Sequence, residues 1–199
     1  MAFRDFTFPE VQHSLGLTLS EADLFRSIAA IELAEDFATR MRGGVDLALA
    51  INTEKARSEF IIAPILLEVR RSLENRYALF SGISFDVDAS RGLNGFCDFI
   101  LSKSPLQSVL TAPVVAITEA KNDNLRSGLG QCIAAMVAAI EFNRQAGSPV
   151  AAVHGVVTTG AAWKFLRLAE SHLTLDIREY FVDQLGHIVG ILRHILVTS

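Results

Sequence analysis

The sequence predicts an α/β fold, in which a central mixed β-sheet is flanked by helices. The first observation is a change of period. Apolar residues recur at helical spacing before residue 75 and at every second position in three short runs between residues 82 and 121. The second observation is a long apolar helical pattern over residues 125–146, with further strand-like runs behind it. Helices and strands that follow one another in this way favour layers packed around one sheet.

The chain has 199 residues, half of them hydrophobic, and contains no repeat and no linker-like stretch. These features predict a single domain over residues 1–199 with an N-terminal helical segment over residues 1–50. In that segment we expect Ser20 to cap a helix that ends at Gly43 and Gly44. A second helix is expected to begin near Asn52 or Thr53, with a kink or break close to Pro64 because proline cannot donate the backbone hydrogen bond.

The rest of the chain predicts strands and two helices. Three short runs rich in Val, Ile and Phe indicate a meander of sequential strands over residues 82–87, 95–102 and 114–121. A helix over residues 125–146 follows, with Gly147 as its C-terminal cap. The remaining predicted elements are strands over residues 150–158, 163–169 and 173–177 and a C-terminal helix with one apolar stripe.

Composition excludes several classes of protein. The longest apolar run, residues 132–140, is far shorter than the roughly 18 residues that a membrane span requires. The first ten residues do not resemble a secretory signal. We therefore expect a cytoplasmic protein without a membrane partner. The net charge of −4 argues against a protein that coats nucleic acid, and any DNA contact must be local. Phosphate-binding loops, dinucleotide-binding glycine motifs and the HExxH and GxSxG motifs are all absent.

Three charged residues stand out in the strands. In the run over residues 114–121, alternation places Glu119 and Lys121 on one face at the end of an otherwise apolar strand. Burying either charge without a partner would cost several kcal/mol, so the strand must end at a site or a surface. Asp98 is the one charge in the preceding apolar strand. If the two strands are antiparallel neighbours, Asp98 lies beside Glu119.

Two adjacent carboxylates repel each other, and a hard divalent cation such as Mg²⁺ relieves the repulsion while keeping water ligands for a phosphate substrate. Lys121 would then lie within reach of an attacking water and could position it.

These stretches resemble the PD-(D/E)XK nuclease superfamily. The resemblance covers about residues 53–169 and rests on the segments SEFIIAPILLEV, GFCDFI, VVAITEAKND and GLGQCIAAMVAA, followed by HGVVTTGAAWKFLRL. It implies a restriction-endonuclease-like core and a Mg²⁺-dependent endonuclease, with Mn²⁺ as a substitute ion, that hydrolyses DNA as a homodimer or in a larger assembly. The resemblance also implies the roles of five site residues. Asp98, Glu119 and Glu59 would be metal ligands, Lys121 would position the attacking water, and Gln131 would turn its amide toward the site. Cys97 stands where the nominal motif has proline.

Other interpretations stay open. Glu68 competes with Glu59 as the helix-borne carboxylate, and Gln131 can equally be a helix-terminal hydrogen-bonding residue. Glu119 and Lys121 can form an ion pair at a sheet edge, in an interaction domain that has Asp98 far away. The alternative function is a catalytically inactive nuclease-fold module that binds nucleic acid or protein. We expect His154, on an apolar strand, to be a core histidine rather than a ligand.

Overall fold

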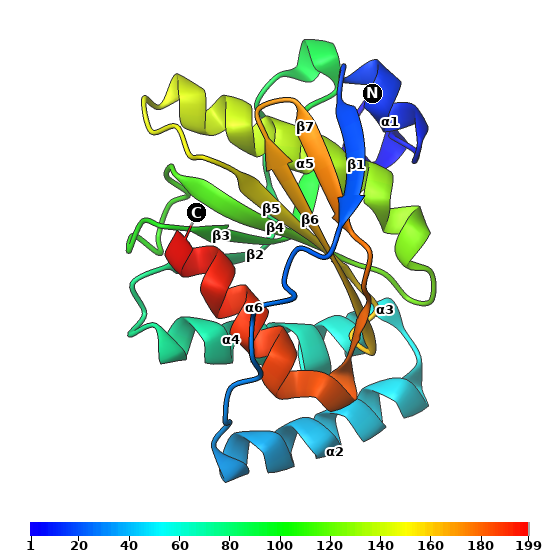
Figure 1. Cartoon of the computed structure of the whole chain (residues 1–199), viewed down its shortest axis with the longest axis vertical. Helices are drawn as coiled ribbons and strands as arrows, with labels where there is room; N and C mark the ends of the chain where they lie inside the picture. Colours follow the sequence, from blue (N-terminus) through cyan, green and yellow to red (C-terminus); the bar gives the residue numbers. More distant parts are fainter. Residues whose placement is uncertain (199) are drawn as a thin grey trace.

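The computed structural model describes residues 1–198 and shows a mixed β-sheet with helices on both faces (Figure 1). The sheet formed by these residues has eight strands. In chain order they are β1 (Thr18–Ala22), β2 (Ala78–Ser84), β3 (Phe96–Ser102), β4 (Val114–Ala120), β5 (Val153–Thr158), β6 (Ala162–Ala169), β7 (His172–Asp176) and β8 (Tyr180–Phe181). The predicted α/β class with a central mixed sheet is therefore confirmed.

The strands lie in the order β1-β7-β6-β5-β4-β3-β2, and the short β8 pairs with β6. Strands β2, β3 and β4 form an antiparallel meander, as the sequence predicts. The next pair, β4 and β5, is parallel, because the intervening helix carries the chain back across the sheet. Strands β5, β6 and β7 are antiparallel, and β1 closes the far edge in parallel with β7.

The helices divide between the two faces of the sheet. They are α1 (Glu10–Ser14), α2 (Glu35–Ile51), α3 (Glu54–Arg57), α4 (Ala63–Ser72), α5 (Leu125–Gln145) and α6 (Leu185–Thr198), with a π-helical turn (Ser58–Ile62) between α3 and α4 and short 3-10 turns at Phe3–Asp5, Ala89–Arg91 and Val182–Gln184. Helix α5 packs on β4 and β5 from one side, whereas α4 and α6 cover the other side and α2 packs outside the α3–α4 segment (Figure 1). Every residue of β4 is buried as a result.

Helix α5 is long and apolar enough by length and composition to cross a membrane. However, 56% of its most apolar window is buried inside the fold. Its small residues lie directly on the sheet, where the side chain of Cys132 approaches the carbonyl oxygens of Ile117 and Val156. These are the properties of a helix that packs in the core of an α/β fold.

The predicted helix between Ser20 and Gly44 is wrong. Ser20 lies in β1, which pairs with β7 in parallel, and its hydroxyl group hydrogen-bonds the imidazole of His172 at 2.8 Å. Residues 23–34 form turns and irregular structure, and α2 runs through both glycines to end at Asn52 in the left-handed conformation. Pairing with a strand more than 150 residues away overrides the local helical pattern.

The second predicted helix is confirmed, including its irregularity. The side chain of Thr53 accepts a hydrogen bond from the backbone N–H of Ala56 and so caps α3. The π-helical turn comes directly before Pro64, which occupies the first turn of α4, where a missing N–H costs least. Such turns insert an extra residue into a helix and often accompany functional sites.

Most of the other predicted boundaries agree with the structure to within a few residues. Strand β2 begins earlier than expected, at Ala78, and continues through Gly82, which has a φ of 61°. The two strands that the sequence did not predict, β1 and β8, are both short. Gly147 follows α5 with a φ of 67°, as its predicted capping role requires.

Gly44 sets the approach of α2 to the π-helical turn. A methyl group at this position would lie 2.6 Å from the backbone oxygen of Phe60, closer than any carbon normally approaches an oxygen. Its neighbour Gly43 faces open space, where an added methyl group would meet nothing within 4 Å. The two glycines therefore have different roles, although they are adjacent in one helix.

We expect Gly44→Ala to destabilise the fold by about 1–3 kcal/mol, because overpacking against a backbone atom forces α2 away from its partner. Gly43→Ala is the matched control and should stabilise by about 0.5–1 kcal/mol, since alanine lowers the entropic cost of helix formation. Urea unfolding of the two variants measures both effects. Equal changes in the two variants would contradict this account of Gly44.

Candidate metal and phosphodiester site

The candidate site lies where β3 begins and β4 ends. In the antiparallel register of these strands Phe99 pairs with Thr118, so Asp98 and Glu119 come one step beyond that pair. The backbone N–H of Ala120 donates a hydrogen bond of 2.8 Å to Oδ2 of Asp98, which fixes this carboxylate against the end of β4. The interpretation that separates Asp98 from Glu119 is therefore wrong.

Glu119 is almost completely buried, with 2% of its surface exposed. Its Oε1 accepts a hydrogen bond of 2.6 Å from Nζ of Lys121. Burial and the negative charge of Asp98 raise the pKa of Glu119 to about 8, although Lys121 acts in the opposite direction. The two carboxylates are thus close enough for one to disfavour ionisation of the other.

Lys121 lies directly after β4, and its side chain is 20% exposed. Burial lowers its pKa, but the charge of Glu119 and the bond to it outweigh that effect and leave the pKa above its ordinary value. Helix α5 makes room for the lysine at Gly128, where a methyl group would lie 3.1 Å from Cγ of Lys121 and 2.7 Å from a methyl carbon of Val157. The ammonium group is consequently charged and held beside the carboxylates.

Asp98 opens onto a hollow of about 280 Å³ between the sheet and the α3 segment. Its wall contains the acidic side chains of Glu54, Glu59 and Asp98 and the basic side chain of Lys55. Ser58, Ser81, Gly82 and Ala120 complete the lining. Burial raises the pKa of Asp98 as well, against the hydrogen bond from Ala120 and the charge of Lys121. The hollow is therefore acidic and favours cations.

The sequence did not single out Glu54, although its charge acts on both Glu119 and Lys121. It lies in the first turn of α3, which Thr53 caps. The one feature of the sequence that could have indicated Glu54 is the predicted helix start near Thr53. A residue directly after a helix cap has a fixed position in the first turn. Nothing in the sequence indicated that this helix start lies against the end of β4.

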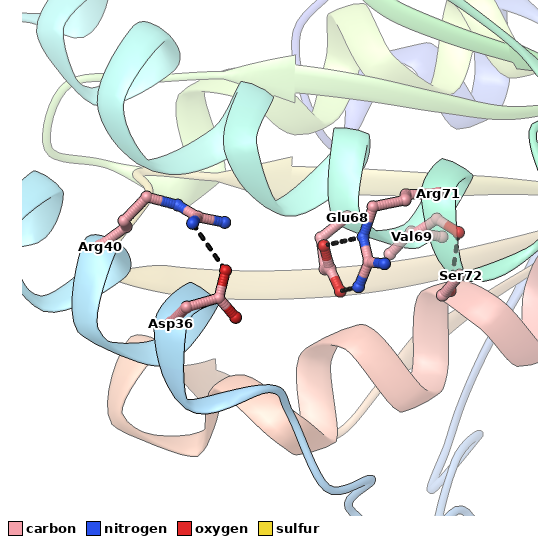
Figure 2. A network of polar contacts seen from close by, with 6 residues as sticks. All are labelled: Asp36, Arg40, Glu68, Val69, Arg71 and Ser72. Carbon is pink, nitrogen blue, oxygen red and sulfur yellow. Dashed lines mark hydrogen bonds and ion pairs between the residues drawn. The ribbon is translucent and has the colours of Figure 1, made fainter.

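Glu59 lies on the rim of the hollow, where its Oε1 forms an ion pair of 2.7 Å with Lys55, and about half of its side chain is exposed. The competing Glu68 is buried and accepts two hydrogen bonds from the guanidinium group of Arg71 (Figure 2). Across from this pair, Asp36 and Arg40 form an ion pair on α2. Of the two glutamates, Glu59 borders the candidate site, and Glu68 is part of helix packing.

Gln131 is half-buried in α5, and its side chain forms no hydrogen bond with another residue of 1–198. It is not part of the lining of the hollow, so its site-facing role stays a prediction. Asn122 follows Lys121, and its Oδ1 is buried without a hydrogen-bond partner in the described chain. A buried amide oxygen of this kind is a free acceptor next to the candidate site.

Two oxygens suit a divalent cation. The described hydrogen bonds reach Oδ2 of Asp98 and Oε1 of Glu119, so within residues 1–198 each carboxylate keeps one oxygen without a hydrogen-bond donor. Within residues 1–198, no group of three or more His, Cys, Asp or Glu side chains lies close enough together to hold a metal ion. Glu59 instead forms an ion pair with Lys55. Mg²⁺ fits such a pair because it commonly binds one or two carboxylates and keeps its water ligands.

No family model, curated protein or solved structure matches the chain. The geometry of these residues is therefore the basis for inferring the function of the protein.

The raised pKa of Glu119 predicts a pH dependence of stability. The folded state holds a proton on this residue up to about pH 8, whereas the unfolded chain releases it near the ordinary value of 4.5, so the contribution is complete at low pH and is lost as pH rises through 8. Between about pH 6.5 and 8.5 we expect the wild type to lose on the order of 1–2 kcal/mol more than Glu119→Gln.

Urea unfolding at the two pH values measures this difference. Glu32→Gln, at an exposed position outside the site, is the control and should follow the wild type. Parallel pH profiles for the wild type and Glu119→Gln would refute the buried, proton-holding carboxylate.

Proposed function

We propose that the protein is a Mg²⁺-dependent phosphodiesterase of the endonuclease type that acts on DNA. The observation that carries this proposal is the pair of carboxylates from neighbouring strands, Asp98 and Glu119, each with a free oxygen beside the Lys121 ammonium group. Carboxylates that repel each other next to a fixed cationic side chain are suited to metal-assisted hydrolysis of phosphate esters.

The acidic hollow by itself would repel a phosphodiester. Glu54, Glu59 and Asp98 line it, and Lys55 is the only basic side chain that residues 1–198 contribute to its lining. A bound divalent cation would offset the negative charge of the hollow and attract the phosphate. Mg²⁺ when bound supplies a Lewis acid that polarises the phosphate and lowers the pKa of water. The free oxygens of Asp98 and Glu119 would hold the ion, and Mn²⁺ would serve as a substitute.

Lys121 has two tasks in this proposal. Its ammonium group holds the Glu119 carboxylate in place through Oε1, which leaves Oε2 directed elsewhere. The same group can donate a hydrogen bond to the attacking water and offset negative charge that develops on the phosphate oxygens. Hydrolysis then proceeds by direct attack of water, without a covalent intermediate on the protein.

The order of elements supports a restriction-endonuclease-like core. A helix that bears Glu59 is followed by the β2–β3–β4 meander, the crossover helix α5 and the parallel strand β5. This order, with Asp98 on the middle strand of the meander and Glu119 and Lys121 at the end of the last one, agrees with the resemblance to PD-(D/E)XK nucleases. The resemblance also implies a homodimer or larger assembly.

One observation favours the second candidate, a non-catalytic module of the same fold that binds nucleic acid or protein. The Glu119–Lys121 ion pair is internally satisfied, and Glu119 is largely protonated at neutral pH because its pKa is about 8. A site that held no metal would be consistent with this arrangement. Metal binding therefore separates the two candidates.

The purified protein should cut or nick DNA in the presence of Mg²⁺ or Mn²⁺, and Asp98→Asn or Lys121→Ala should lower the rate by roughly 10²-fold or more, because each removes a charge that acts on the reacting phosphate. Asp123→Asn is the control, since it makes the same change at an exposed position just beyond the site. Gel assays of plasmid DNA measure the rates. Cleavage by Lys121→Ala at the wild-type rate would eliminate the enzymatic proposal.

We expect Mg²⁺ to bind more tightly as pH rises through about 8, because the ion must displace the proton that Glu119 holds at lower pH. Isothermal titration calorimetry in two buffers of different ionisation enthalpy measures the affinity and the released proton together. Asp98→Asn should weaken binding at least tenfold, and Asp123→Asn should not. Absence of binding at any pH would favour the non-catalytic module.

A further inference from the structure

Lys164 of β6 lies in the same transverse row of the sheet as Glu119. Glu119 pairs with Val157 in the parallel β4–β5 ladder, and Val157 pairs with Lys164 in the antiparallel β5–β6 ladder. Paired residues of neighbouring strands project from the same face of a sheet. Two strand spacings of about 4.8 Å each separate Lys164 from Glu119. Lys164 therefore lies beside the candidate site without being one of its carboxylate or lysine members.

The first turn of α5 lies over this row, between two lysines. A methyl group at Gly128 would lie 2.7 Å from a side-chain carbon of Val157 and 3.1 Å from Cγ of Lys121. Both of these side chains, and hence that of Lys164, are on the α5 face of the sheet. Arg126 is exposed in the same turn of α5. We call Lys121, Arg126 and Lys164 the basic rim, because they follow one another across the end of β4, the end of β5 and the start of β6.

Two of the three cations of the basic rim have no internal partner. Lys121 is bonded to Glu119, whereas Lys164 and the guanidinium group of Arg126 form no hydrogen bond or ion pair within residues 1–198. Lys164 is nevertheless partly buried. Arg57, another partly buried cation, instead donates to a backbone carbonyl oxygen and to a side-chain amide. Lys164 and Arg126 are therefore available to an external anion.

The acidic side chains close to the basic rim along the chain do not neutralise it. Asp123 precedes Arg126 in the turn before α5, and Glu179 precedes β8, which pairs with the start of β6. Both carboxylates are exposed, and neither forms an ion pair within the described residues. The hollow on the α3 face, by contrast, is lined by three carboxylates and a single lysine. The same end of the sheet is thus acidic on its α3 face and basic on its α5 face.

We propose that the basic rim binds the backbone of the DNA substrate, with Lys164 in contact with a phosphate next to the one that is cleaved. The inference rests on the proposed function, because it takes DNA as the substrate. Lysine and arginine side chains are common partners of DNA phosphates, and such contacts position the DNA without reading its sequence. The acidic hollow then holds the cation, and the basic rim on the other face guides the strand toward it.

The salt dependence of DNA binding tests the basic rim. A short fluorescein-labelled duplex is titrated with the protein in EDTA, where no strand is cut, and fluorescence anisotropy gives the affinity between roughly 50 and 200 mM KCl. Each phosphate contact contributes about 0.9 to the slope of log affinity against log salt concentration. Lys164→Gln should therefore reduce the slope by about 0.9 and weaken binding roughly threefold or more at the lowest salt. Lys164→Arg keeps the charge and should retain the wild-type slope.

Arg167→Gln is the matched control. It removes the same charge from the same strand, but Arg167 is three residues further along β6 and so projects from the opposite face of the sheet. This variant should keep the wild-type slope, which excludes a general effect of net charge. A loss of fold in Lys164→Gln would lower the affinity without giving a slope that Lys164→Arg restores.

The outcomes separate this inference from the enzymatic proposal. No DNA binding by the wild type, an unchanged slope in Lys164→Gln, or equal reductions in Lys164→Gln and Arg167→Gln would each overturn the basic rim. An unchanged slope together with cleavage by the wild type in Mg²⁺ would overturn the rim alone. A slope that depends on Lys164 supports the rim, even where the absence of cleavage in Mg²⁺ rejects the enzyme.

Discussion

Burying the Glu119 carboxylate at the end of β4 costs free energy that only neighbouring groups can offset, and this constraint organises the centre of the molecule. Lys121 offsets the charge through a 2.6 Å bond, and Gly128 in α5 leaves space for the lysine. Asp98 adds a second negative charge rather than removing the first, while it accepts a hydrogen bond from the backbone N–H of Ala120. The fold thus keeps two acidic side chains close together, at a cost in free energy that two apolar residues would not have. Such arrangements are typical of functional sites.

The sequence predicted the parts of the fold that local patterns determine. The strands β3 and β4 and the helix α5 were predicted almost to the residue, because alternation and helical periodicity are clear there. The convergence of Asp98, Glu119 and Lys121 followed from antiparallel pairing of neighbouring strands, a short-range inference. The helix predicted from Ser20 failed because β1 exists only through pairing with β7, a contact that no local pattern encodes.

The same distinction applies to the site. Glu54 was not predicted because its contribution depends on how α3 packs against the sheet, and an exposed helix charge has no distinguishing pattern of its own. His154 looked like an ordinary core histidine, and it is indeed buried. Its environment becomes unusual only through Arg167 and His194, which are 13 and 40 positions further along the chain. Sequence patterns indicate which residues are buried more readily than which charges they will meet.

The contact between Gly44 and Phe60 gives α2 a mechanical connection to the acidic hollow. The Phe60 carbonyl rests against Gly44, and the adjacent Glu59 stands on the rim of the hollow within the same π-helical turn. Single π-helical turns inside α-helices are rare and are frequently found at functional sites. Because α2 packs on this turn and on α3, a substitution that displaces α2 at Gly44 would act on the segment that carries Glu59, although α2 itself does not line the hollow.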